Sequence, residues 1–524
     1  MRLFSQRHLI VASAWLFAGA GLPGEAGNLD TMGVTLVRAN DPALTGAGIT
    51  VGQPEATSGV NDWEVYPPNT GQPASLFTWI NTNGSSTSYP NSLGINSSHA
   101  DQVGNCFYGS TAGVAPGVFH VDNYEGDYFY FSNIVAGAPI PDMVVNQSFI
   151  FTGGDPPQTT VDSAYDTYMA NTGILFCSAV GNGGPPSAAA TAYNGLGVGC
   201  YGLDANSSTG PTLDNGRSKP DLVTPGVVTS FSTPYASGAA AVLLQSAARG
   251  DGGTNTAAAG DPRTVKALLL NGALKPGDWT HTPPAPLDTR YGAGVLNLWY
   301  SWQQLTNGRQ PLSVSQTVPA GADHPPGTPA SLIAAPLGWD FQTITNPSPA
   351  EDVVNHYYFD NSASPAAALT LTATLAWNRG AGQTAINNLA LFLYNSAGGN
   401  LVTNSVSAVD NVQHIYVPSL PPGQYDLQVV KYGSQTNSVT PSETYALAFQ
   451  FYPVSPPLLC LSLSGASAVI SWPCSPTLFN LQQTASLSPP ITWTPVAAAG
   501  LITNTTVSVT LSPSNSAAFY RLSR

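Results

Sequence analysis

The sequence predicts an α/β fold with a mostly parallel sheet, followed by two all-β modules. Short apolar strands alternate with helical segments between about residues 30 and 309, which is typical of a parallel sheet covered by helices. After a segment rich in Pro, Gly and Ala, short alternating strands bounded by turn residues indicate a β-sandwich. A second proline-rich stretch then leads into a smaller set of strands. The predicted units are 1–26, 27–309, a linker at 310–330, the sandwich at 331–453 and a small β module at 458–524.

Apolar runs and turn residues place the individual elements. In the α/β unit we expect strands at 49–51, 117–121, 143–146, 174–179 and 196–200, and helices after His99, at 161–171, after Ser230 and at 262–273. In the sandwich we expect strands at 369–377, 388–394, 412–417, 424–430 and 444–451. In the last module we expect them at 459–463, 468–472, 479–482 and 519–522.

The N-terminal segment 1–26 has the pattern of a signal peptide. Arg2 and Arg7 precede an apolar run, and small residues then offer cleavage sites near Ala20 and Ala26. The apolar run is too short to cross a bilayer comfortably, and no other apolar stretch of the sequence approaches the length of a membrane span. We therefore expect a secreted or exported protein, extracellular or periplasmic, with no membrane span.

Composition narrows the classes of partner. The chain has 15 basic and 29 acidic residues, a net charge of −14, which disfavours nucleic acid and anionic membranes as partners. The five cysteines leave at least one thiol unpaired, and Cys460 with Cys474 or Cys177 with Cys200 are the pairings that the spacing leaves open. No Cys or His cluster in the sequence indicates zinc. We expect no cofactor; structural calcium stays open without an identifiable site.

Four segments, in a particular order along the chain, carry the candidate chemistry. Glu55 ends a strand that follows a glycine turn, and catalytic groups of α/β sheets gather at the carboxyl ends of strands. His99 follows hydroxyl residues at a predicted helix start, and Asn182 lies in a Gly-Asn-Gly turn after an apolar strand. Ser230 begins a helix of Ala and Leu, where free N–H groups and the helix dipole favour negative charge near its Oγ.

Together these segments resemble the subtilisin-like serine peptidases over about residues 30–305. Lys-Pro-Asp-Leu-Val-Thr-Pro-Gly at 219–226 is similar to the family's Lys-Pro-Asp-Val-Val-Ala-Pro-Gly, and the acid–His–Ser order also matches. Residues 331–453 resemble the β-sandwich that follows the catalytic domain in some larger members. The resemblance implies a secreted serine endopeptidase acting on proteins or peptides, expected to be a monomer. It implies Ser230 as nucleophile, His99 as base, Glu55 as acid, Asn182 as oxyanion-hole donor and Ser148 as a residue of the substrate-binding strand.

The chemistry of such a site explains these residue types. His99 would take the proton of Ser230, so we expect the Ser230 Oγ within hydrogen-bond reach of a His99 ring nitrogen. A carboxylate would hold the other ring nitrogen and stabilise the imidazolium. The Asn182 amide would donate to the oxyanion, and Thr229, adjacent to the nucleophile, would support the same oxyanion.

Four residues depart from the family pattern. Glu55 replaces the usual Asp, Ala100 and Val228 replace glycines, and Ile150 stands where Gly is common beside the substrate strand. Asp62 is the alternative acid. The alternative functions are a domain that has lost catalysis and serves as a secreted binding or scaffold protein, and a carbohydrate- or surface-binding protein that acts through the two β modules.

Overall fold

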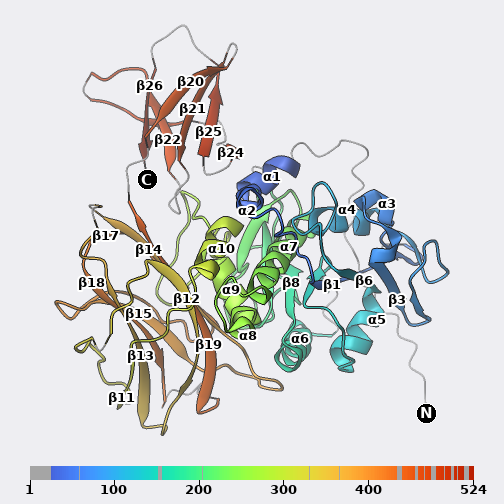
Figure 1. Cartoon of the computed structure of the whole chain (residues 1–524), viewed down its shortest axis with the longest axis horizontal. Helices are drawn as coiled ribbons and strands as arrows, with labels where there is room; N and C mark the ends of the chain where they lie inside the picture. Colours follow the sequence, from blue (N-terminus) through green and yellow to red (C-terminus); the bar gives the residue numbers. More distant parts are fainter. Residues whose placement is uncertain are drawn as a thin grey trace.

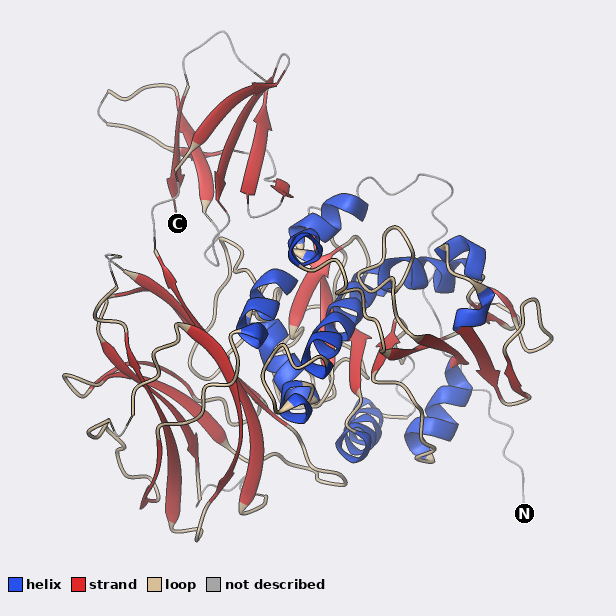
Figure 2. Ribbon diagram, viewed as in Figure 1, coloured by secondary structure: helices blue, strands red, loops and turns tan. Residues whose placement is uncertain are grey.

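The computed structural model contains an α/β body, a two-sheet β body and a smaller C-terminal β module (Figures 1 and 2). The predicted signal peptide falls almost wholly outside the described residues, since the first described helix, α1 (Glu25–Thr31), begins at its end. The described residues are 25–57, 59–151, 156–202, 204–329, 331–364, 366, 368–433, 439–454, 458–464, 467–473, 479–488, 490–496, 501–503, 506–512 and 518–523.

The α/β body is built on an eight-stranded sheet in the order β10-β9-β8-β7-β1-β6-β3-β4, which confirms the predicted fold class. Its strand pairs are parallel, apart from the antiparallel pair of β3 with β4. The five expected strands are present, with ends shifted by at most about four residues. The strands are β1 (Thr50–Glu55), β3 (Phe77–Asn81), β4 (Gly84–Ser86), β6 (His120–Glu125), β7 (Val144–Gln147), β8 (Leu175–Ala179), β9 (Leu196–Tyr201) and β10 (Leu222–Pro225).

Helices cover both faces of this sheet (Figure 2). They are α2 (Val34–Asn40), α3 (Pro67–Thr70), α4 (Ser98–Phe107), α5 (Gly126–Tyr128), the π-helix η2 (Phe129–Val135), α6 (Gln158–Thr172), α7 (Thr229–Ala248), α8 (Thr256–Ala259), α9 (Pro262–Asn271) and α10 (Leu298–Thr306). A 3₁₀ turn, η1 (Ala74–Leu76), precedes β3, and β2 (Asp62–Glu64) pairs with β5 (Ile95–Asn96) just before α4.

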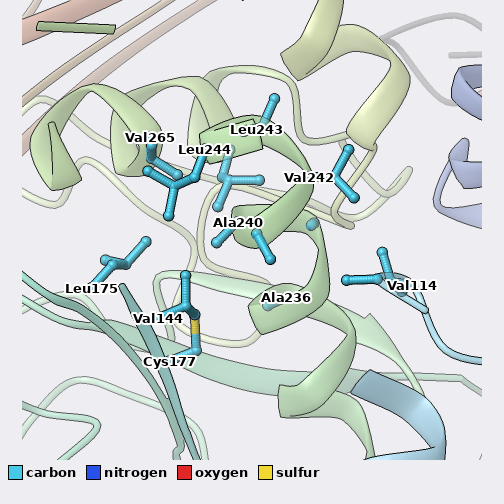
Figure 3. Packing of buried hydrophobic residues seen from close by; sticks show 14 of the residues in the cluster. Val114, Val144, Leu175, Cys177, Ala236, Ala240, Val242, Leu243, Leu244 and Val265 are labelled. Carbon is cyan, nitrogen blue, oxygen red and sulfur yellow. The ribbon is translucent and has the colours of Figure 1, made fainter. Parts of the chain in front are cut away.

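Helix α7 is the central helix of this body. It is buried along almost its whole length, and its small residues let it lie close to the sheet. Ala236 and Ala240 face Val144 of β7 and Cys177 of β8, as the close view of the core shows (Figure 3). This packing fixes the position of Ser230 in the first turn of the helix.

The second body is a β-sandwich, as predicted. One sheet has the order β11-β13-β18-β15-β16 and the other β12-β19-β14-β17, and their inner faces share one hydrophobic core. The strands are β11 (Val314–Pro319), β12 (Leu337–Thr345), β13 (Glu351–Asp360), β14 (Leu369–Trp377), β15 (Leu389–Asn395), β16 (Asn400–Ser405), β17 (Val412–Leu420), β18 (Gln424–Lys431) and β19 (Ser442–Pro453).

Part of the predicted linker belongs to this sandwich. Within 310–330, β11 pairs antiparallel with β13, so the expectation of an unstructured connection is wrong for these residues. β11 is an edge strand that buries only Val318, and it ends at Pro319. A mostly exposed edge strand beside prolines has little of the apolar alternation that reveals a strand in a sequence.

The sandwich packs on the α/β body through buried polar contacts. Every residue of β14 is buried, because the outer face of its sheet lies against α9. Arg379 forms an ion pair with Asp166 of α6 at 2.7 Å, and its backbone exchanges two hydrogen bonds with the side chain of Asn194. The guanidinium carbons of Arg379 and Arg217 lie over the Tyr193 ring, 4.7 and 3.9 Å from its centre.

The C-terminal module has a small core of its own, formed by Ile470, Trp472, Leu481, Val507 and Val509. Its strands are β20 (Cys460–Ser464), β21 (Ser467–Pro473), β22 (Asn480–Thr484), β23 (Thr494–Pro495), β24 (Leu501–Thr503), β25 (Thr506–Leu511) and β26 (Phe519–Ser523). They form two separate sheets, β20-β21-β25-β24 and β23-β22-β26.

Cys177, Cys200 and Cys460 are free thiols in the structure. Cys177 and Cys200 do lie on neighbouring strands, but Cys177 is paired with Leu196, so Cys200 lies further along β9. The suggested pairing of Cys177 with Cys200 is therefore not made. Cys460 is an exposed thiol, and its suggested partner Cys474 lies outside the described residues.

Candidate active site

Glu55 and His99 come together at the carboxyl edge of the sheet. Glu55 ends β1, and His99 lies in the first turn of α4, whose N-cap residue Ser97 accepts a hydrogen bond from Ala100 N. His99 Nδ1 is 2.8 Å from Glu55 Oε2. The carboxylate is 1% exposed and the imidazole 15% exposed. A buried carboxylate at Nδ1 favours the tautomer that carries the proton there, which leaves Nε2 without a proton and able to accept one.

The alternative acid, Asp62, has a different role. Its Oδ1 accepts a hydrogen bond from Gly59 N at 2.6 Å, within the turn that leads into β2. Among the described residues, the carboxylate at hydrogen-bond distance from His99 is that of Glu55.

Ser230 lies in the first turn of α7, where its segment passes beside His99. The ring of the next residue, Phe231, is 5.5 Å from the His99 ring, measured between centroids. Val228 is the N-cap residue, with φ −131° and ψ 149°. This is extended backbone, which β-branched residues adopt readily, so the replacement of the family's glycine by Val228 does not strain the turn.

The Ser230 hydroxyl is engaged with Ser148 instead of His99. Ser230 Oγ donates to the Ser148 carbonyl at 3.1 Å, and Ser148 Oγ donates to the Ser230 carbonyl at 2.7 Å. The Ser230 carbonyl is free to accept because Pro234, four residues on, has no N–H to offer it. Within the described residues no hydrogen bond joins Ser230 to His99, so the expected contact is not made in this conformation.

Asn182 is held from one side by the residue before Ser230. Its Oδ1 accepts from Thr229 N at 2.8 Å and from Thr229 Oγ1 at 2.9 Å. We expected Thr229 to support the oxyanion directly, but its hydroxyl proton is directed at Asn182 Oδ1. Because both lone pairs of that oxygen are occupied, the Asn182 NH₂ group is turned away from Thr229 and is available as a donor.

Ile150 lies close to this turn. Its Cδ1 is 3.7 Å from the position that a Cβ on Gly181 would take, directly beside Asn182. The side chain thus fills space next to the predicted oxyanion donor.

Two residues that the sequence analysis did not identify are linked to the acid: Gln53 contacts Glu55, and Tyr108 contacts Gln53. Gln53 Nε2 donates to Glu55 Oε1 at 2.8 Å, and the Tyr108 hydroxyl donates to Gln53 Oε1. The spacing in the sequence could have indicated Gln53 as a neighbour of the acid, because it lies two residues before Glu55 and therefore on the same face of β1.

Within the described residues, no group of three or more His, Cys, Asp or Glu side chains is arranged to hold a metal ion. None of the helices that the structure describes is long and apolar enough to cross a membrane.

The chain was compared with protein families, curated proteins and solved structures. Residues 131–294 match the model of the Subtilase family; this segment contains Ser148, Asn182 and Ser230, whereas Glu55 and His99 precede it. No curated protein sequence matches the chain.

Many solved structures align with parts of the chain. The crystal structure of tripeptidyl peptidase 2 aligns with 81% of this chain and 54% of its own, at 12% identity and a TM-score of 0.31. This chain thus spans about half the length of that protein. A β-glucuronidase from Ruminococcus gnavus aligns with 33% of this chain and 32% of its own, at 11% identity and a TM-score of 0.13. Residues 131–294 of the α/β body are thus similar to the Subtilase family.

Proposed function

We propose that this chain is an exported serine endopeptidase that hydrolyses peptide bonds through Ser230, His99 and Glu55, with Asn182 as an oxyanion donor. The observation that carries the proposal is the 2.8 Å contact between Glu55 Oε2 and His99 Nδ1 beside the Ser230 segment. The family match of residues 131–294 supports a serine peptidase. Export is supported by the sequence pattern at 1–26 alone.

The reaction would begin with a rotation of the Ser230 side chain. Its Oγ would leave the Ser148 carbonyl and turn towards His99 Nε2, which takes the proton as Oγ attacks the peptide carbonyl carbon. Glu55 stabilises the imidazolium that forms. The imidazolium then gives its proton to the leaving amine, and water, activated by the same nitrogen, hydrolyses the acyl-enzyme to release the acid and restore Ser230. No step needs a metal ion or a cofactor.

The oxyanion would be met by two groups. The Asn182 NH₂ group is directed away from Thr229 and can donate to the oxyanion. The Ser230 N–H belongs to the first turn of α7, whose N–H groups lack partners within the helix and lie at the positive end of its dipole. Donors fixed before the reaction stabilise the developing charge without reorganising.

Substrate would lie along the carboxyl end of β7, where Ser148 leads into Ile150. The expected substrates are proteins or peptides, and the acidic chain is not expected to act on nucleic acid. We propose that the chain works as a monomer, with a peptidase domain at 27–309, the sandwich ending at residue 453 and the last module at 458–524.

Labelling with a fluorophosphonate probe tests the proposal directly. The wild-type protein should be labelled, and Ser230→Ala and His99→Ala should not, while Ser246→Ala, a buried serine further along the same helix, should be labelled like wild type. Cleavage of an internally quenched peptide with both ends blocked would establish endopeptidase action. Labelling of Ser230→Ala at the wild-type rate would contradict the assignment.

The second candidate is a domain that binds without cleaving. The reciprocal hydrogen bonds of Ser230 and Ser148 favour it, because they hold the hydroxyl away from His99. Under this alternative the folded wild-type protein would remain unlabelled, and peptides would bind with equal affinity to wild type and Ser230→Ala.

A further inference from the structure

Gln53 is buried between the predicted acid and the helix that carries the predicted base. It is 0% exposed on β1. Its Nε2 donates both to Glu55 Oε1 at 2.8 Å and to the Ala100 carbonyl at 2.9 Å, and its Oε1 accepts from the Tyr108 hydroxyl. The amide therefore contacts Glu55 on one side and both ends of α4 on the other, since Ala100 is in the first turn of α4 and Tyr108 is its C-cap residue.

The orientation of this amide follows from its partners. A flipped amide would direct Oε1 at a carboxylate oxygen and a carbonyl oxygen, which are both acceptors. Burial raises the pKa of Tyr108 well above its usual value, so the phenol keeps its proton and donates it. The backbone of Gln53 is also held, because Asn123 Nδ2 donates to its carbonyl at 3.0 Å.

The consequence for Glu55 is that each carboxylate oxygen has its own partner. Oε1 is held by Gln53 and Oε2 by His99. A glutamate has one more rotatable bond than an aspartate, so its carboxylate needs a second contact to stay in one place. Gln53 supplies that contact and ties it to α4, which carries His99.

We infer that Gln53, oriented by Tyr108, is a positioning residue that holds Glu55 and α4, the helix of His99, in the relative position that proton transfer requires. The inference rests on the proposed function, and it adds two residues to the site that act through Glu55 and His99 without touching the substrate. It also accounts for a glutamate at a position where an aspartate is usual.

Two variants test it kinetically. Gln53→Met keeps the length of the side chain and removes its hydrogen bonds, and Tyr108→Phe removes the hydroxyl that orients the amide. We expect kcat to fall about 10- to 100-fold in Gln53→Met, the rate equivalent of one hydrogen bond to a charged group, and less in Tyr108→Phe, with KM unchanged in both. Tyr357→Phe, which removes a buried hydroxyl contact with Asp340 in the sandwich, is the control for loss of stability alone.

The conservative variant Gln53→Glu gives a signature that a purely structural role would not produce. Its new carboxyl can still accept from Tyr108 and, while protonated, can donate to Glu55. Two adjacent buried carboxyls share one proton with a raised pKa. The ratio of the Gln53→Glu kcat to the wild-type kcat should therefore be highest at lower pH and fall as that proton is lost, whereas the same ratio for Gln53→Met should not change with pH.

A proton NMR measurement separates failure of the inference from failure of the proposed function. The Nδ1 proton of His99, bonded to Glu55, should give a downfield resonance in the wild type that His99→Ala lacks. If the fluorophosphonate does not label the wild type, the peptidase proposal fails, and loss of this resonance in Gln53→Met would still support the positioning role. An unchanged resonance, or a wild-type kcat, in folded Gln53→Met would overturn it.

Discussion

Lys275 is a buried lysine whose charge should set a pH dependence of stability. It is 2% exposed, and its Nζ donates to the carbonyls of Ala273 and Ala293. No carboxylate forms an ion pair with it among the described residues. The ring of Trp279 lies 5.1 Å from Nζ. Burial lowers the pKa of Lys275 from 10.5 to about 7.

The sign of the effect follows from proton counting. Between pH 7 and 10.5 the unfolded chain holds the Lys275 proton and the folded chain does not, so the free energy of unfolding rises with pH in that window. The slope approaches about 1.4 kcal/mol per pH unit midway between the two pKa values and is smaller near each of them, which gives roughly 3 kcal/mol between pH 7 and 10. The neighbouring histidines do not contribute there, since burial lowers the pKa of His281 to about 4 and that of His414 well below its usual value.

Urea denaturation of the wild type and of Lys275→Met at pH 7, 8, 9 and 10 measures this term. The thiols and phenols of the chain also titrate in this range, but they are common to both proteins and cancel when the two curves are subtracted. The wild type should gain about 3 kcal/mol relative to the methionine variant from pH 7 to 10. A difference that stays constant over the four pH values would show that Lys275 keeps an ordinary pKa, and would refute the reasoning.

Three other groups of variants have expected outcomes, at the oxyanion donor, at the buried ion pair and at the two β modules. Asn182→Ala should lower kcat about 100- to 1,000-fold on a quenched peptide, with little change in KM. Thr229→Val removes one of the two donors that orient Asn182, so it should lower kcat less. A larger loss of kcat in Thr229→Val than in Asn182→Ala would exclude Asn182 as the oxyanion donor. Arg379→Met leaves the buried Asp166 without its ion-pair partner, so calorimetry should show a loss of about 3–5 kcal/mol in the free energy of unfolding. An unchanged melting temperature would mean that the pair does not hold the sandwich. Truncation after Pro453 should leave the melting temperature of the remaining chain unchanged. A chain ending at Asn307 should melt at a lower temperature or aggregate, because loss of the sandwich exposes α9. Equal stability of the two truncated chains would show that the sandwich is an independent appendage.

Sequence periodicity located strands with an apolar residue at every second position and missed β13, which buries amide and ionisable side chains. The strand 369–377 was predicted with the bounds that β14 has, since Leu and Thr alternate along it. β13 was not predicted, because His356 and Asn355 are both buried in it. His356 is accommodated by Asp426 on β18, 2.7 Å away. A partner 70 positions away in the sequence cannot be inferred from a local pattern.

In the candidate site too, the sequence could predict the local position of a residue but not its partners in space. The sequence could place Glu55, Ser148 and Asn182 at or just beyond strand ends, but not show that those strands are neighbours. In the structure β1, β7 and β8 are adjacent in the sheet, so their carboxyl ends meet at one edge. The start of α7 is held there from two of these strand ends, by the Ser148 hydroxyl on the carbonyl that Pro234 leaves free and by the Asn182 oxygen on Thr229. The position of Ser230 is thus a property of the sheet order, which no single motif contains, whereas the direction of its hydroxyl depends on one χ1 rotation.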